Sequence, residues 1–161
     1  MSDSTLTEIY KGWETYQGYL IKAVAPLSDD QLALSTSPTL RTISKIALHL
    51  IAVRVRWFHN AAGAGKAEEY AAIGLWDRDG QPSRSAAELV SGLETTWRLI
   101  QEALASWTPA DLETPFTRLW QGEEHSLTRQ WIIWHVIEHD VHHGGEISLT
   151  LGSHGLTGLD V

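Results

Sequence analysis

Four histidines lie within nine residues near the C-terminus, at His135, His139, His142 and His143. Histidine is the commonest protein ligand for transition metals and the side chain that titrates closest to neutral pH. The segment is otherwise largely apolar, and a polar ring in apolar surroundings is costly unless it has a partner. The cluster therefore predicts a site that does chemistry, with metal binding as the first interpretation.

The spacing of these histidines suggests which of them act together. Residues four apart on a helix lie on one face, so His139 and His143 could converge on one ion, and so could His135 and His139. A metal site needs at least one more ligand from elsewhere in the chain. His49 is the natural candidate, because it stands alone in an apolar stretch, residues 46–51, on a different predicted helix.

Three neutral imidazoles leave a position on the ion open, which is the pattern of catalytic rather than structural sites. Zinc at such a site lowers the pKa of a bound water to about 7, and nickel or iron also accepts imidazole ligands. Glu138, Asp140 and Glu146 are candidates to hold a ring N–H of these histidines. The simpler interpretation is that each carboxylate is a solvated helix charge and that His49 is a hydrogen-bonded core residue.

Two other metal interpretations use different residues. His135-Val136-Ile137-Glu138-His139 matches H-x-x-E-H, an inverted zinc-peptidase motif. That motif requires an acidic ligand far downstream, which the short remainder of the chain after His139 disfavours. A di-iron bundle would need inward carboxylates on several helices, and the first and third predicted helices show no such set.

Composition limits the class of protein. At 161 residues and 43% hydrophobic residues the chain suits a single domain, residues 1–161, and no apolar run is long enough to span a membrane. The net charge of −8 disfavours nucleic acid and anionic membranes as partners. The chain has no cysteine, and its first residues, 1–5, do not resemble a signal peptide, so we expect a cytoplasmic protein.

Apolar residues recur at helical spacing in four stretches, at about residues 4–25, 41–62, 84–106 and 126–151. Four long amphipathic helices in one domain predict an all-α fold, a four-helix bundle. The long connection between the second and third helices permits a non-sequential arrangement of the helices.

The segments between the helices carry recognisable turn and cap signals. Ser28-Asp29-Asp30-Gln31 predicts a capped single turn, Ser85 and Glu88 a capping box, and Thr108-Pro109 a helix start. Residues 116–120 and 123–127 predict a short hairpin around Gln121-Gly122. Gly152 is the expected end of the fourth helix.

In these residues and their spacing, the chain resembles the DinB-like family of bacterial metalloproteins, which are damage-inducible, YfiT-like four-helix bundles. The resemblance covers nearly the whole chain. It rests on His139-Asp140-Val141-His142-His143-Gly144-Gly145-Glu146 and on the helix-two segment Ala47-Leu48-His49-Leu50. Carried over by position, it implies His49, His139 and His143 as metal ligands.

The resemblance also implies a divalent metal, often zinc or nickel, a frequent homodimer and a small-molecule substrate. Its characterised members include enzymes that use a low-molecular-weight thiol for S-transfer or isomerisation, so the expected activity is a metal-dependent transferase or hydrolase. This chain departs from the usual Arg-Gly-Gln after the last histidine by carrying Gly144, Gly145 and Glu146. The alternative is a non-catalytic metal- or ligand-binding stress protein.

Overall fold

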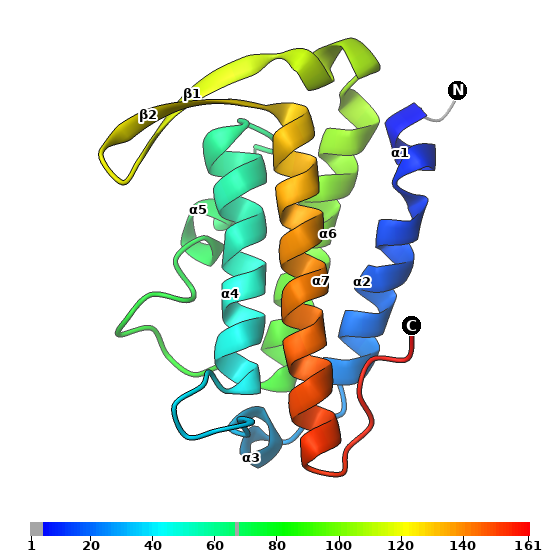
Figure 1. The fold of residues 1–161 in the computed structure, drawn as a ribbon, viewed down its shortest axis with the longest axis vertical. Helices are drawn as coiled ribbons and strands as arrows, with labels where there is room; N and C mark the ends of the chain where they lie inside the picture. Colours follow the sequence, from blue (N-terminus) through cyan, green and yellow to red (C-terminus); the bar gives the residue numbers. More distant parts are fainter. Residues whose placement is uncertain (1–4, 67) are drawn as a thin grey trace.

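Four long helices carry most of the chain in the computed structural model, which describes residues 5–66 and 68–161. They are α2 (Lys11–Val24), α4 (Ile43–Val55), α6 (Ala86–Ser106) and α7 (Arg129–Ser153). The shorter elements are α1 (Thr5–Ile9), α3 (Asp29–Leu32), α5 (Glu69–Ile73) and a hairpin of β1 (Pro115–Trp120) and β2 (Glu123–Thr128). The predicted all-α helical bundle is thus confirmed, with one small hairpin added to it (Figure 1).

The helices do not follow one another around the bundle. α4 packs against both α6 and α7, and α2 also packs against α6 and α7, so α2 and α4 lie diagonally opposite (Figure 1). The segment 25–42, which holds α3, and the segment 107–128, which holds the hairpin, therefore each cross an end of the bundle. This arrangement brings α4 and α7, the two helices with the histidines, side by side.

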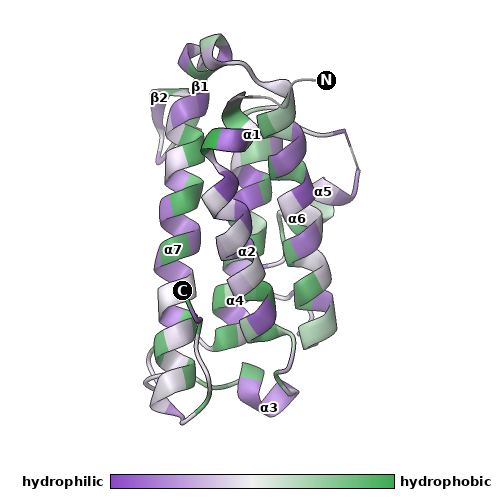
Figure 2. Ribbon diagram, turned by 90° about the vertical axis from the view of Figure 1, so that its right-hand side faces the viewer, coloured by the Kyte–Doolittle hydropathy of each residue, from purple (hydrophilic) through white to green (hydrophobic). Residues whose placement is uncertain are grey.

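α4 is the most deeply buried helix. Nearly every residue from Ile43 to Val55 is inaccessible to solvent, with His49 among the few exceptions. A helix that is apolar all round belongs in the interior of a fold. Along the other long helices hydrophobic and hydrophilic residues alternate, as Figure 2 shows, so each of those helices has one face toward the core and one toward solvent.

Several predicted caps are confirmed. The side chains of Ser28, Ser85 and Thr108 each form a capping box, with Gln31, Glu88 and Asp111 as the returning partners. The hairpin is also confirmed, and its turn residues Gln121 and Gly122 both have positive φ, at 54° and 85°. Such turns match the twist of the two strands they connect.

The bounds of the first two predicted helices need correction. The first is interrupted at Tyr10, which lies outside the helical region at ψ 16°, while apolar residues continue at helical spacing on both sides of the break. Its predicted start at residue 4 lies outside the described residues, as do residues 1–3. The second begins at Ile43, after the Thr42 cap, and changes at Arg56–Ala61 into a π-helical turn.

The bounds of the fourth helix were also wrong. It begins at Arg129 rather than 126, because residues 123–128 pair with β1 as a strand. It continues through Gly152 to Ser153, and the glycine with positive φ after it is Gly155 at 73°. Within the described residues, none of the helices combines the length and the apolar character that a membrane crossing requires.

Candidate metal centre

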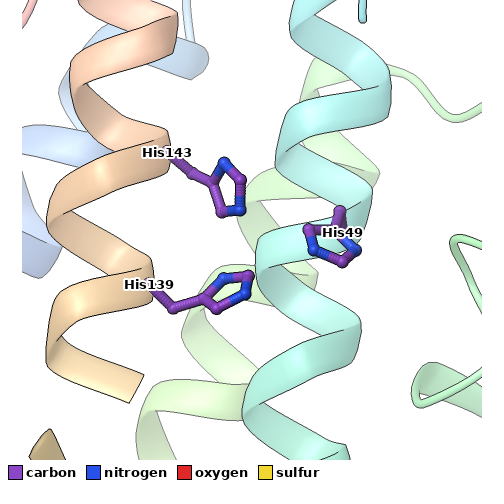
Figure 3. A group of neighbouring side chains, drawn as sticks. All are labelled: His49, His139 and His143. Carbon is purple, nitrogen blue, oxygen red and sulfur yellow. The ribbon is translucent and has the colours of Figure 1, made fainter. Parts of the chain in front are cut away.

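His49, His139 and His143 come together between α4 and α7. One ring nitrogen of each lies within 4.8 Å of the corresponding nitrogen of the other two. Figure 3 shows the single ring from α4 facing the two rings that α7 places one turn apart. Residues separated by about ninety positions in the sequence thus form one cluster, and it is the triplet that the spacing and the family resemblance indicated.

The three rings are slightly farther apart than the ligands of a bound metal ion would be. The ring centroids of His139 and His143 are 4.5 Å apart, and that of His49 lies 5.0 Å and 5.1 Å from them. Nitrogens around a tetrahedral zinc at its usual bond lengths are about 3.3 Å apart. A modest rotation of the side chains would therefore bring three donors onto one ion.

The outer nitrogen of His49 is held by a carboxylate. Nδ1 of His49 donates to Oδ2 of Asp77 at 2.7 Å, and Arg56 donates to both oxygens of the same group at 2.7 Å and 2.9 Å. Burial alone would raise the pKa of Asp77, but the hydrogen bonds from Arg56 and His49 lower it to about 2. An ionised carboxylate can only accept, so the proton of His49 lies on Nδ1 and the Nε2 lone pair is left for a ligand.

His143 has the same kind of support from its own helix. Its Nδ1 donates to Oε2 of Glu146 at 2.6 Å, and Arg41 lies 3.7 Å from that oxygen. The hydrogen bond from His143 helps to lower the pKa of Glu146 against the opposing effect of burial. A carboxylate that fixes the ring orientation of a ligating histidine is a common feature of metal sites. Glu146, one of the three carboxylates considered from the sequence, thus lies where a ligand-supporting residue is needed.

His139 differs from the other two. Its Nδ1 is buried and has no hydrogen-bond partner among the described residues. Burial, followed by the neighbouring histidines, lowers the pKa of His139 to about 3, so the ring is neutral at physiological pH. A neutral imidazole is the form that binds metals. Coordination to a metal would replace the hydrogen bonds to water that the ring loses on burial.

His135 belongs to an aromatic wall beside this centre. Its ring stacks on Trp131 with centroids 4.5 Å apart and meets the edge of Trp57 at 4.9 Å. The guanidinium of Arg118, on the inward face of β1, lies 4.1 Å above the Trp57 ring, and its Nη1 is buried without a described partner. The described residues provide no group of three ligands that includes His135, so the peptidase arrangement of His135, Glu138 and His139 is not assembled.

His142 lies outside the cluster. Its side chain is 67% exposed and lies 3.7 Å from Glu146. His142, His143 and Glu146 do form a second set of closely spaced ligand atoms. In that set, however, Glu146 already accepts the hydrogen bond from His143, which makes it a supporting carboxylate of the first site.

Asp140 supports the fold instead of a histidine. It lies on the interior side of α7, where Arg54 donates from Nε to Oδ1 at 3.1 Å and from Nη2 to Oδ2 at 2.7 Å. Trp13 donates its indole N–H to Oδ2 at 2.7 Å, and Gln17 accepts from Nη1 of Arg54 at 2.8 Å. The expectation that Asp140 holds a ring N–H is therefore wrong, because adjacent helix residues point about 100° apart. Glu138 is exposed and has no hydrogen bond to a described histidine.

The glycine that follows His143 has a packing explanation. A Cβ at Gly144 would collide with the hydroxyl of Tyr16 and press on Leu20, both on α2. Tyr16 in turn donates to the carbonyl of Val141 at 3.3 Å. The close approach of α2 to α7 therefore disfavours a side chain at position 144.

Sequence reasoning missed three residues of this region, namely Asp77, Arg56 and Arg118. Asp77 lies in the connection after α5, and no local pattern ties it to a histidine 28 positions earlier. Arg118 gave a weak signal, since strand alternation places it on the same inward face as Phe116, where an apolar residue is expected.

Comparison with known proteins supports the resemblance found in the sequence. Residues 1–160 match the DinB family. Among solved structures, the fold is similar to that of a DinB-like protein from Bacillus cereus ATCC 10987, with a TM-score of 0.74 and 21% sequence identity. The match covers 100% of this chain and 99% of that one. No curated protein matches the sequence. On the family match over nearly its whole length, the chain belongs to the DinB family.

Proposed function

We propose that this protein is a metal-dependent enzyme in which His49, His139 and His143 bind one divalent ion. The observation that carries the proposal is the convergence of three imidazoles, two of them oriented by carboxylates and the third with a buried Nδ1 that has no partner among the described residues. Zinc and nickel both accept imidazole nitrogens as ligands and are the ions that the family resemblance implies. A divalent ion held by three protein ligands supplies a Lewis acid with an open position, which lowers the pKa of a water or thiol that binds there.

The protein groups around the centre have distinct roles in this proposal. Asp77 and Glu146 accept hydrogen bonds from Nδ1 of His49 and His143, which leaves Nε2 of each ring for the ion. The aromatic wall lies on one side of His139 and limits the access of water there. It consists of Trp57, Trp131 and His135.

The proposed reaction is thiol-dependent S-transfer, or hydrolysis, on a small molecule. Because the chain has no cysteine, a thiol nucleophile has to come from a low-molecular-weight thiol that binds as co-substrate. In S-transfer the thiol loses its proton and forms a carbon–sulfur bond to the electrophile, which releases its leaving group. In hydrolysis water takes the place of the thiol.

The first test is the metal content of the chain purified without a histidine tag. We expect about one equivalent of a transition metal per chain, or stoichiometric uptake of added zinc or nickel with a rise in melting temperature. A metal content far below one equivalent, with no change in stability on adding either ion, would overturn the proposal. A screen of thiols against small electrophiles then tests the reaction.

A non-catalytic metal- or ligand-binding stress protein is the second candidate. The observation that favours it is the change from the usual family residues to Gly144 and Glu146 beside His143. It predicts metal binding without turnover of any thiol, ester or amide. Turnover that is lost in His139→Ala would exclude it.

We also propose that the protein forms a homodimer through the outer face of α7. Trp134, Val141 and Leu149 lie seven and eight residues apart on that face and are 55%, 52% and 65% exposed. Large apolar side chains aligned on an exposed helix face are typical of subunit interfaces. Light scattering should give twice the chain mass for the wild type, and Val141→Glu should shift the mass toward one chain. A wild-type mass equal to one chain would contradict this proposal.

A further inference from the structure

A hollow of about 380 Å³ opens beside His49, between the N-terminal half of α4 and residues 76–81. Its volume is in the range of small-molecule sites. Arg41 and Lys45 line it from the α4 side, and Trp76, Asp77 and Arg78 line it from the other. Since His49 also lines it, a ligand in the hollow would lie next to the three-histidine centre.

The charge of the hollow is opposite to that of the whole protein. The chain carries a net charge of −8, yet three cations, Arg41, Lys45 and Arg78, line the hollow with two anions, Asp77 and Asp79, and Arg41 also pairs with Glu146 at 3.7 Å. Asp77 is already neutralised by the two-fold hydrogen bond from Arg56. The hollow therefore has an excess of positive charge, which favours an anion.

The positions of two of these cations disagree with local helix preferences. Arg41 and Lys45 flank the Thr42 cap at the N-terminus of α4, whose first turn has no acidic residue, as in α7 and unlike α2, α3 and α6. Cations at this end oppose the helix dipole. Lys45 and Arg78 are exposed and form no ion pair with a described residue, so their charges are accessible to a ligand.

The spacing of these residues points the cations toward the candidate metal centre. Lys45 and His49 are four residues apart on α4, so they lie on one side of that helix, and Arg41, which precedes the Thr42 cap, lines the same hollow. Asp77 fixes the facing loop, because it is bound to both His49 and Arg56. Arg78 is the next residue after Asp77, so it adds a third cation to the hollow from a segment distant in sequence from α4.

We propose that this hollow binds the anionic group, a carboxylate or a phosphate, of a small molecule whose remaining part reaches the three-histidine centre. The second half of this statement rests on the proposed function, while anion binding itself does not. The cations orient the ligand and do not touch the reacting atoms, so they are positioning residues.

The test is an NMR titration of the metal-free, ¹⁵N-labelled full chain at low ionic strength, with succinate and inorganic phosphate as separate probes and succinamide as the neutral control. We expect saturable shifts of amides in residues 42–49 and 76–81 with at least one anion and none with succinamide. Lys45→Gln combined with Arg78→Gln should weaken that affinity by about fivefold or more. The matched control is Lys22→Gln with Lys66→Gln, which removes the same charge elsewhere and should bind like the wild type.

Absence of saturable shifts with both anions would overturn the proposal, and so would equal weakening in the two double variants. Saturation with succinate alone or phosphate alone supports it and names the anionic group. A parallel zinc titration separates this inference from the proposed function. Anion binding without zinc binding would leave the hollow as a site and refute the metalloenzyme, whereas zinc binding without anion binding would do the reverse.

Discussion

Two polar clusters lie on neighbouring residues of α7 and differ in how well they are satisfied. Asp140 and Arg54 are 1% and 0% exposed, and the side chains around them supply a dense set of hydrogen bonds. His139, the preceding residue, meets two other histidines and keeps a buried nitrogen without a described partner. A fully satisfied buried network holds one arrangement of a core, whereas an incompletely satisfied one needs a ligand.

The Arg54–Asp140 cluster also helps to position the histidine cluster. The Arg54–Asp140 pair joins α4 to α7, the two helices that supply the three histidines. Since Asp140 adjoins His139, fixing its carboxylate on Arg54 sets the rotation of α7 against α4. The position of the histidine rings thus depends on a network that lies on a neighbouring face of the same helix.

The largest expected effect comes from breaking the fully satisfied cluster. Asp140→Ala leaves the Arg54 charge buried and unpaired, which should lower the free energy of unfolding by about 3–5 kcal/mol. Urea unfolding of the metal-free protein measures this, with Asp160→Ala at the exposed C-terminus as the control. The double variant Arg54→Met with Asp140→Leu should lose less than Asp140→Ala alone. A loss below about 1 kcal/mol in Asp140→Ala would show that the pair does not hold the helices together.

Mutations in the histidine cluster should change the stabilisation by added metal much more than they change the stability of the metal-free protein. His139→Ala or His143→Ala should abolish the stabilisation by added zinc, which is about 2.7 kcal/mol for an intact site at a hundredfold excess over Kd. His139→Ala should change metal-free stability by only about 1 kcal/mol, because Nδ1 of His139 has no hydrogen-bond partner among the described residues. His135→Ala should keep the zinc effect. The opposite pattern, with binding lost in His135→Ala and kept in His143→Ala, would favour the peptidase arrangement.

The supporting carboxylates should give an intermediate effect. Asp77→Asn and Glu146→Gln should each weaken zinc binding about 10- to 100-fold, because they release the tautomer and orientation of His49 and His143. Competition with a chromophoric chelator measures these affinities. Asp79→Asn, on the same loop, is the matched control and should bind like the wild type. Unchanged affinity in both supporting variants would show that the rings are oriented by packing alone.

The smallest expected effect is on pH dependence. The pKa of His139 is about 3 in the folded protein, below its ordinary value of 6.5. The unfolded chain therefore binds a proton between these values that the folded chain does not, so metal-free stability should fall as the pH is lowered from 7 to 5. The ordinary pKa values of carboxylates, about 4, lie below this range.

Urea unfolding at several pH values checks the assignment to His139. His139→Leu should flatten the dependence, with the remainder coming from His143 and His135, whose pKa values burial also lowers. His142→Gln, at an exposed position, should leave it unchanged. A wild-type stability that stays constant or rises toward pH 5 would contradict the assignment.

The sequence predicted the elements better than their ends. Helical periodicity identified all four long helices, and cap residues such as Ser85 and Glu88 marked their starts. It failed at Tyr10 and at Arg56–Ala61, where the apolar spacing continues through a change of backbone conformation. It also extended the fourth helix into β2, because Leu127 suits either a helix or a strand with one buried face.

The sequence by itself determined the ligand types and the pair on α7, because four-residue spacing places His139 and His143 on one face of any helix. It also singled out His49, since an isolated imidazole in an apolar helix needs a partner. Only the tertiary structure decided that Asp77 rather than Asp140 supports a histidine, that Arg54 occupies the core, and that Arg78 lies near Lys45. These contacts join elements distant in the chain, and they follow from the diagonal arrangement of the helices, which no local periodicity encodes.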